Sequence, residues 1–261
     1  MIPIALTIAG SDPSGGAGIQ ADLKTFHQLG VYGTAAITLI TVQNTTRVSR
    51  VETLDPALVS EQIDAVLEDL PPRAAKTGAM GTWAIIEAVA ACSIECPLVV
   101  DPVMISKHGA PLMDSTARDA LRRLLLPKAA LITPNLQEAA ELAGMPVEDF
   151  AQMKEAATRI GPSVLIKGGH LHGDAVDLLY HSGFFTELRA DRIDTRHTHG
   201  TGCTYSAAIT AWLARGFPIV EAVTRAKRFI DEAIRTNPGI GAGSGPVNHW
   251  AASDLKQGDS L

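Results

Sequence analysis

The sequence predicts an α/β fold with an open, mostly parallel sheet, and two observations support this prediction. Short apolar runs alternate with segments of helical periodicity along most of the chain. Polar residues with glycine or proline follow these runs closely, as at 10–18, 101–102 and 133–135. Because the carboxyl ends of parallel strands meet at one edge of a sheet, we expect these residues to gather in one ligand site.

Length and composition indicate one globular domain over residues 1–261. The 261 residues are 46% hydrophobic and 19% charged, which suffices for a large core and is not typical of disorder. The chain shows no internal repeat and no linker. Its net charge of −6 argues against a nucleic-acid partner, so a small anionic ligand would need a local positive site.

Hydropathy and cysteine content favour the cytoplasm. No apolar run approaches the ~18 residues of a membrane span, so we expect no membrane partner. The first residues lack a basic segment ahead of an apolar stretch, so we expect no signal peptide. Three cysteines, an odd number, fit a reducing compartment better than a disulfide framework.

The first strand is expected at 4–9 and leads into a glycine-rich loop at 10–18. The helix after it ends at Gly30 and has apolar residues on one face: Ile19, Leu23, Phe26 and Leu29. The loop is neither a Walker A motif nor a G-x-G-x-x-G fingerprint. Its glycines predict close approach of the backbone to a ligand, and a tight strand-to-helix turn is the alternative.

A second strand is expected at 34–41, and Gln43 follows it. The amide of Gln43 offers donors and an acceptor, which suits the edge of a small heterocycle. An ordinary polar loop residue is the alternative.

Asp55 and Pro56 begin a helix with an apolar inner face: Leu58, Val59, Ile63, Val66 and Leu67. A strand at 74–77 and a helix at 83–91 follow. Met80, between them, is a candidate pocket residue, although core filling is the usual role of a methionine.

Carboxylates follow two expected strands. Asp101 ends the strand at 97–101. After a helix at 115–126 and a strand at 130–133 come Asn135 and Glu138. Since Mg²⁺ prefers a few oxygen ligands and water, Asp101 and Glu138 predict a magnesium and phosphate site. A turn role for Asp101 and a helix-capping role for Glu138 are the alternatives.

A helix at 149–160 and a strand at 163–166 lead to Lys167, which two glycines follow. A lysine at a strand end is a candidate phosphate ligand. The runs 174–180 and 184–190 alternate around a Ser-Gly turn, which predicts an antiparallel hairpin at the sheet edge.

The stretch 198–204 places glycines where a loop becomes a helix that continues to 213; a last helix is expected at 219–234. The N–H groups of a first helical turn lack partners, so this start predicts a cradle for an oxyanion. Cys203 lies in the same turn, where we expect a lowered thiol pKa and an acid/base role. An ordinary glycine-rich helix start with a half-buried cysteine is the alternative.

Two histidine pairs, His170/His172 and His197/His199, have the spacing that puts both side chains on one face of a strand. No third ligand lies near either pair in the sequence, so we expect no zinc site.

Together these segments resemble the hydroxymethylpyrimidine and phosphomethylpyrimidine kinases. Residues 9–22, AGSDPSGGAGIQAD, are similar to the N-terminal signature of this family. Five motifs follow in the expected order: 42–45 (VQNT), 100–103 (VDPV), 133–138 (TPNLQE), 167–170 (KGGH) and 199–203 (HGTGC). The resemblance covers about 4–233 and implies a three-layer ribokinase-like fold, with helices on both faces of the sheet.

The resemblance implies an activity in thiamine synthesis. ATP would phosphorylate 4-amino-5-hydroxymethyl-2-methylpyrimidine and then its monophosphate, with Mg²⁺ as cofactor. It also implies a homodimer as the usual assembly of the family.

The resemblance also implies roles for individual residues. Gln43 would bind the pyrimidine, with five residues around it: Gly10, Ala17, Asp22, Met80 and Val103. Asp101 and Glu138 would organise Mg²⁺, with Asn135 beside them. The ATP phosphates would be held by Lys167 and by the backbone of Gly200, Thr201 and Gly202.

The chain resembles the pyrimidine kinases in having Cys203 where most ribokinase-like sugar kinases carry Asp. The thiol would accept the proton of the substrate hydroxyl or only position that hydroxyl. Three other functions compete: a pyridoxal kinase of the same fold, a ligand-binding regulator without activity, and a hydrolase with a cysteine nucleophile.

Overall fold

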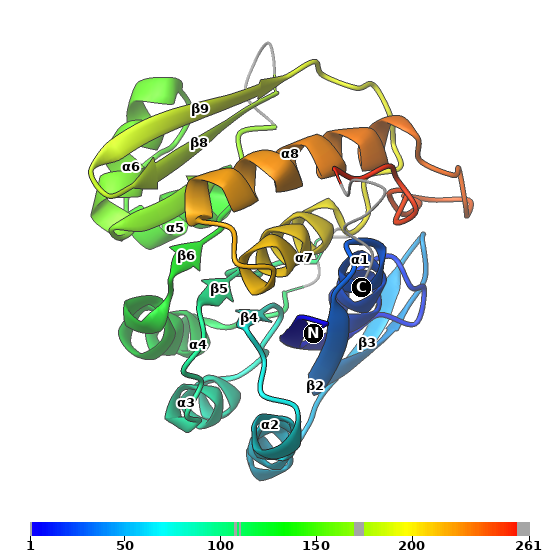
Figure 1. The fold of residues 1–261 in the computed structure, drawn as a ribbon, viewed down its shortest axis with the longest axis vertical. Helices are drawn as coiled ribbons and strands as arrows, with labels where there is room; N and C mark the ends of the chain where they lie inside the picture. Colours follow the sequence, from blue (N-terminus) through cyan, green and yellow to red (C-terminus); the bar gives the residue numbers. More distant parts are fainter. Residues whose placement is uncertain (1, 107–108, 110, 170–174, 255–261) are drawn as a thin grey trace.

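The computed structural model describes residues 2–106, 109, 111–169 and 175–254. Within these residues, nine strands form one sheet in the order β3-β2-β1-β4-β5-β6-β7-β8-β9 (Figure 1). The strands are β1 (Ile4–Ser11), β2 (Tyr32–Gln43), β3 (Val48–Thr53), β4 (Ala74–Thr77), β5 (Leu98–Val100), β6 (Leu131–Ile132), β7 (Ser163–Ile166), β8 (Ala175–His181) and β9 (Phe184–Ala190). The predicted α/β fold class is confirmed.

Parallel pairing runs without interruption from β2 to β7. The predicted edge hairpin is formed by β8 and β9, which pair from Ala175↔Ala190 to His181↔Phe184. At the other edge β3 pairs antiparallel with β2. The parallel strands therefore all end at one edge of the sheet, as the sequence predicts.

The helices are α1 (Gly18–Gln28), α2 (Pro56–Asp69), α3 (Trp83–Ala91), α4 (Ser115–Ala120), α5 (Leu136–Ala143), α6 (Phe150–Ile160), α7 (Thr201–Ala214) and α8 (Ile219–Arg235). Side chains cap several first turns, because a short polar group satisfies the unpaired N–H groups there: Asp55, Thr82, Asp114, Asn135 and Asp149.

Helices cover both faces of the sheet (Figure 1). Successive strand residues point to opposite faces, so Ala5 and Leu6 of β1 belong to different clusters of buried side chains. The cluster with Ala5 includes side chains of α1, α7 and α8. The cluster with Leu6 includes side chains of α2, α3 and α4, and a third cluster lies under α5 and α6.

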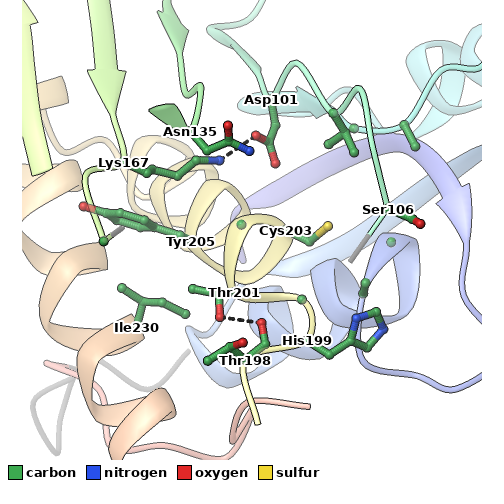
Figure 2. A pocket seen from close by; sticks show the side chains of 18 of the residues that line it. Asp101, Ser106, Asn135, Lys167, Thr198, His199, Thr201, Cys203, Tyr205 and Ile230 are labelled. Carbon is green, nitrogen blue, oxygen red and sulfur yellow. Dashed lines mark hydrogen bonds and ion pairs between the residues drawn. The ribbon is translucent and has the colours of Figure 1, made fainter. Parts of the chain in front are cut away.

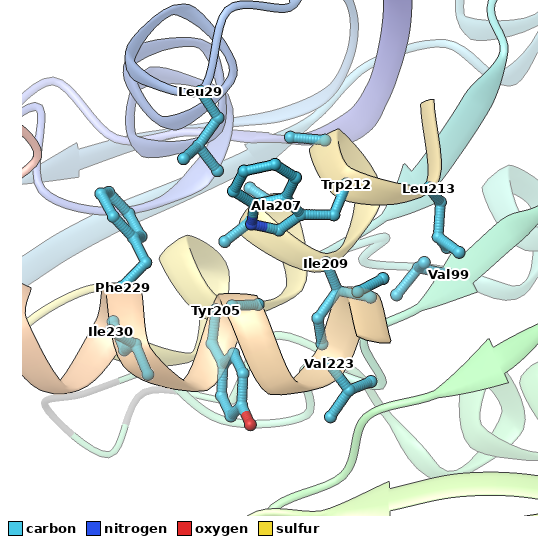
Figure 3. Close-up of a cluster of buried hydrophobic side chains, with 14 of the residues drawn as sticks. Leu29, Val99, Tyr205, Ala207, Ile209, Trp212, Leu213, Val223, Phe229 and Ile230 are labelled. Carbon is cyan, nitrogen blue, oxygen red and sulfur yellow. The ribbon is translucent and has the colours of Figure 1, made fainter. Parts of the chain in front are cut away.

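Helix α7 is buried along nearly its whole length, from Thr204 to Ala214. Its apolar side chains meet those of α1, α8 and the sheet (Figure 3). Trp212 is 1% exposed, and the ring of Phe217 packs edge-on against it at 5.3 Å between centroids. A helix enclosed this way holds its first turn in a fixed position.

Two elements differ from the sequence-based prediction. Strand β3 was not predicted, because none of its residues is buried and it has no apolar face to recognise. The helix expected at 115–126 ends as α4 at Ala120 and continues as a π-helical segment, η1 (Leu121–Leu125), and a 3-10 segment, η2 (Leu126–Lys128). Pro127 lies in η2 and lacks the N–H that an α-helix would need there.

In the part of the chain that the structure describes, no helix has the length and apolar character needed to cross a membrane.

Trp212→Ala should lower the free energy of unfolding by about 3–5 kcal/mol, because it leaves a cavity between α7 and its neighbours. Denaturant titration monitored by circular dichroism measures the change. The matched control is Trp250→Ala, since Trp250 is 69% exposed and its loss should cost less than about 0.5 kcal/mol. Equal losses for the two variants would contradict the packing role of Trp212.

Candidate active site

A cavity of ≈ 670 Å³ lies along the carboxyl ends of the parallel strands. Residues that follow β1, β4, β5, β6 and β7 line it, and the first turn of α7 faces them (Figure 2). It brings together most of the residues singled out from the sequence: Gly10, Ala17, Gln43, Asp101, Val103, Asn135, Glu138, Lys167, Gly200, Thr201, Gly202 and Cys203.

The first turn of α7 is open to a ligand. No side chain caps it, in contrast to the first turns of α5 and α6. Gly200 precedes it with a φ of 78°, which favours glycine. A Cβ on Gly202 would lie 3.4 Å from Lys167 Nζ, so the absence of a side chain keeps the space before this ammonium clear. Partial positive charge and a lysine thus face the same space.

Cys203 lies in this first turn and lines the cavity, partly exposed. Figure 2 shows its sulfur between Asp101 on one side and His199 on the other. The expectation of a lowered thiol pKa was wrong. Burial raises the pKa of Cys203 to about 11, and the charges of Asp22 and Asp101 add to this effect while Lys76 opposes it. The helix start alone does not decide the protonation of this thiol.

Asp101 and Lys167 form an ion pair at the ends of β5 and β7, with 2.9 Å between Lys167 Nζ and Asp101 Oδ1. Thr133 donates to the same carboxylate at 3.2 Å, and Ser206 of α7 donates to Oδ2 at 3.2 Å. Burial acts to raise the pKa of Asp101, but Lys167 and Lys76 outweigh it and the pKa lies below its usual range. Asp101 is therefore a fixed anion.

Glu138 belongs to a capping box at the start of α5. Its Oε2 accepts from the N–H of Asn135 at 2.8 Å, and the Asn135 side chain accepts from the N–H of Glu138 at 2.9 Å. The predicted alternative, a capping role, is confirmed, and both residues also line the cavity. Burial raises the pKa of Glu138 to about 7; Asp101 adds to the effect and Lys167 works against it.

A second set of contacts, missed by the sequence reasoning, joins the loop after β1 to the loop before α7. His199 Nε2 lies 2.7 Å from Asp12 Oδ2 and 3.1 Å from the amide nitrogen of Gln43. Asp12 also accepts from Ser14 and from the N–H of Ala17. The Asp-Pro-Ser sequence was a signal for the turn, but nothing local pointed to a partner 187 residues away.

Nε2 of His199 is thus engaged by Asp12 and Gln43. A cysteine hydrolase would need a histidine within hydrogen-bond reach of the sulfur.

Asp22 and Met80 are not among the described residues that line the cavity. Asp22 is 0% exposed and pairs with Lys76, and Met80 is 0% exposed within the cluster under α2 and α3. The two residues lie beneath the cavity wall instead of facing a ligand. Asp22 is held there by its ion pair with Lys76, and Met80 packs in the apolar core.

Among the described residues no group of three or more His, Cys, Asp or Glu side chains could hold a metal ion. His170 and His172 lie outside the described residues.

Comparisons with known proteins give a consistent picture. The family model described as phosphomethylpyrimidine kinase matches residues 12–248. The "Hydroxymethylpyrimidine/phosphomethylpyrimidine kinase" of Synechococcus elongatus is 49% identical, over 95% of this chain and 98% of its own. The "Thiamine biosynthesis bifunctional protein ThiED" of Geobacter sulfurreducens is 47% identical over 96% of this chain, which spans only 53% of that protein.

Among solved structures, an ADP complex of Bacillus subtilis pyridoxal kinase superposes with a TM-score of 0.89. It is 40% identical, and the match covers 96% of this chain and 98% of that one.

Glu138→Gln should change how stability depends on pH. A carboxyl whose pKa is raised to about 7 on folding stabilises the protein fully below its unfolded pKa, and this contribution is lost as pH rises through 7. Between about pH 5.5 and about pH 8.5 the variant should gain about 2 kcal/mol relative to the wild type. Urea titrations at both pH values measure this gain.

The exposed glutamate Glu61 on α2 provides the control, Glu61→Gln, for effects common to any such replacement. A difference between Glu138→Gln and wild type that is the same at both pH values would contradict the raised pKa.

Proposed function

The chain belongs to the phosphomethylpyrimidine kinase family, and from this premise we propose that it phosphorylates 4-amino-5-hydroxymethyl-2-methylpyrimidine with ATP. It then phosphorylates the monophosphate to the diphosphate, in thiamine biosynthesis. The proposal is carried by one observation: Cys203 and the uncapped first turn of α7 share a cavity with Lys167 and Asp101.

In this proposal the hydroxymethyl oxygen lies between Cys203 and the γ-phosphate of ATP. The sulfur accepts the hydroxyl proton in its thiolate form, which the raised pKa makes the minor form near neutral pH, while the oxygen forms its bond to phosphorus. The bond from phosphorus to the ADP oxygen breaks, and its electron pair leaves with ADP. Lys167 and the N–H groups of Gly200, Thr201 and Gly202 stabilise the phosphate charge.

The pyrimidine binds at the other end of the cavity. Gln43 contacts the ring, and Gly10, Ala17 and Val103 surround it; all four residues line the cavity. The His199–Asp12 contact holds the Gln43 amide in place. Asp22 and Met80 are not ring contacts in this proposal, since both are buried beneath the wall.

Asp101 and Glu138 have the chemistry of a magnesium site. Both are buried carboxylates, and the charge of Asp101 helps to raise the pKa of Glu138. A divalent cation would relieve this repulsion, and Mg²⁺ is commonly held by one or two carboxylates together with substrate phosphates. When bound, it would neutralise charge on the ATP phosphates. Asn135 keeps Glu138 in position through the capping box.

Pyridoxal phosphorylation is the second candidate, and the superposition on the pyridoxal kinase of Bacillus subtilis favours it specifically. Pyridoxal also carries a hydroxymethyl group on a heteroaromatic ring, so the same proton transfer would serve. The two reactions differ in the ring that Gln43 would contact.

We further propose a homodimer in the cytoplasm. Exposed apolar side chains on β2, namely Tyr32, Ile40 and Val42, support an assembly of two copies. Three cysteines without disulfides support a reducing compartment. Size-exclusion chromatography with light scattering tests the dimer.

Purified protein should release ADP when given either pyrimidine, measured in a coupled assay with hydroxymethylpyrimidine, its phosphate and pyridoxal in turn. Turnover of both pyrimidines above pyridoxal supports the proposal. Turnover of pyridoxal alone would replace it with the second candidate, and ADP release without any added acceptor serves as the blank.

Cys203→Ala should lower kcat by about 10²–10⁴-fold, because the substrate hydroxyl loses its proton acceptor. Cys203→Ser should lower it less, since a hydroxyl still positions the substrate. The same ADP assay measures both, and Cys92→Ala, at the C-terminal end of α3 and outside the cavity lining, should turn over like the wild type. Wild-type turnover by Cys203→Ala would remove the thiol from the mechanism.

A further inference from the structure

A fully buried ion pair lies beneath the cavity and is not used by the mechanism above. Lys76 of β4 and Asp22 of α1 are both 0% exposed, with 2.9 Å between Nζ and Oδ2. Thr7 donates to the same carboxylate at 2.6 Å. Replacing such a pair with apolar residues is often neutral or stabilising. Stability alone therefore does not account for two charges at this place.

The Lys76 ammonium lies close to the cavity wall. A Cβ on Gly78, which lines the cavity, would be 3.7 Å from Lys76 Nζ. Gly78 follows β4 directly, so the lysine side chain reaches along the inside of the wall toward the site. Around this position the wall is thin, since Gly78 has no side chain and the nearest side chain is the methyl group of Ala9.

The same side of the site contains the Cys203 sulfur. Gly18, the first residue of α1, lines the cavity together with Cys203. Asp22 follows one turn later on α1. Asp22 and Lys76 therefore lie buried behind the wall, on α1, whose Gly18 lines the cavity together with Cys203, and on β4, which the cavity-lining Gly78 follows.

The charged groups that face the sulfur come from four elements. Lys76 of β4 is the strongest favourable charge, while Asp22 of α1 and Asp101 after β5 are unfavourable. Lys167 after β7 also interacts with it. Burial lowers the pKa of Lys76, but Asp22, Cys203 and Asp101 outweigh it, so this amine stays protonated.

We propose that Lys76 is a positioning residue whose buried charge stabilises the thiolate of Cys203, and that the charge of Asp22 beside it partly offsets this stabilisation. The use of this thiolate as proton acceptor rests on the proposed function. Its stabilisation does not, because it is a property of the protein without substrate. Lys76 does not touch the substrate and acts only through the sulfur.

Opposite effects of the two members of the pair are the signature of this role. Lys76→Met removes the favourable charge and should raise the pKa of the Cys203 thiol. Asp22→Asn removes an unfavourable charge and should lower it. The double variant should lie between wild type and Lys76→Met, because Lys76 acts more strongly than Asp22. A purely structural pair would instead be disturbed alike by either single change and restored by the double one.

Thiol alkylation by iodoacetamide, followed against pH in the protein without substrate or nucleotide, measures this order. Mass spectrometry of the Cys203 peptide gives the rate at this site. At fixed pH below the pKa, Lys76→Met should react about tenfold more slowly, since one pKa unit is a tenfold change in thiolate. Asp22→Asn should react a few-fold faster, about threefold on the same scale.

Two controls separate charge from misfolding. Cys92 and Cys96 are internal references, because their alkylation should not change in any of the variants. Lys227→Met removes another buried ammonium, paired with Asp177 at 3.0 Å at the other end of the cavity. It should leave the pKa of Cys203 unchanged. Circular dichroism checks that each variant is folded. If a single variant is not folded, the alkylation rate of the double variant is compared with that of the wild type instead.

The proposal is overturned if Lys76→Met leaves the Cys203 alkylation profile unchanged, or if both single variants shift it in the same direction. ADP release is measured in parallel, and kcat should follow thiolate content with little change in KM for ATP. If the wild-type protein shows no kinase activity, the proposed function is refuted, but the alkylation result still tests the role of Lys76. An active wild type without the predicted order would refute only the role of Lys76.

Discussion

The site depends on the close approach of two backbones at Gly16 and Gly200. A Cβ on Gly200 would lie 1.7 Å from the carbonyl oxygen of Gly16, and the φ of 78° at Gly200 disfavours other residues as well. At this contact the loop after β1 packs directly against the start of α7. His199 and Asp12 fasten the same two loops with a 2.7 Å contact. The junction adjoins the cavity, which Ala17, His199 and Gly200 line.

The enclosure of α7 explains why its first turn can act as a rigid site. Its side chains are buried from Thr204 onward, so the helix cannot tilt without opening the core. The residues of α7 that line the cavity are Thr201, Gly202, Cys203 and, one turn further on, Tyr205. The packing of α7 against its neighbours thereby holds the Cys203 sulfur and the N–H groups of the first turn in place. The contacts between the loops then only have to position the residues around them.

Local patterns in the sequence predicted most elements and most cavity residues. The strands at 74–77 and 163–166 and the helix at 83–91 agree with β4, β7 and α3 to the residue, because each has a strong local signal and a clear end. Strand β3 has no such pattern. The pairs Asp12–His199 and Asp22–Lys76 could not be predicted either, since they join residues from distant segments and depend on tertiary packing. For the same reason the pKa of Cys203 was misjudged: the helix start is local, but burial and neighbouring charges are not.

The balance of buried charge at the cavity explains why a phosphate ligand needs more than the lysines. Lys76 and Lys167 face Asp22, Asp101 and Glu138. With Glu138 ionised the acids exceed the lysines by one charge, and with Glu138 protonated the charges cancel. An incoming polyphosphate therefore meets no net positive charge from these side chains, and attraction must come from the first turn of α7 and from a bound cation. In the protein without ligands, burial and the charge of Asp101 make ionised Glu138 unfavourable, which raises its pKa. A cation beside Glu138 would stabilise the ionised form and lower this pKa again. The nucleotide is thus expected to bind more tightly when the metal is bound, and the metal more tightly when the nucleotide is bound, because each supplies the charge that the other lacks.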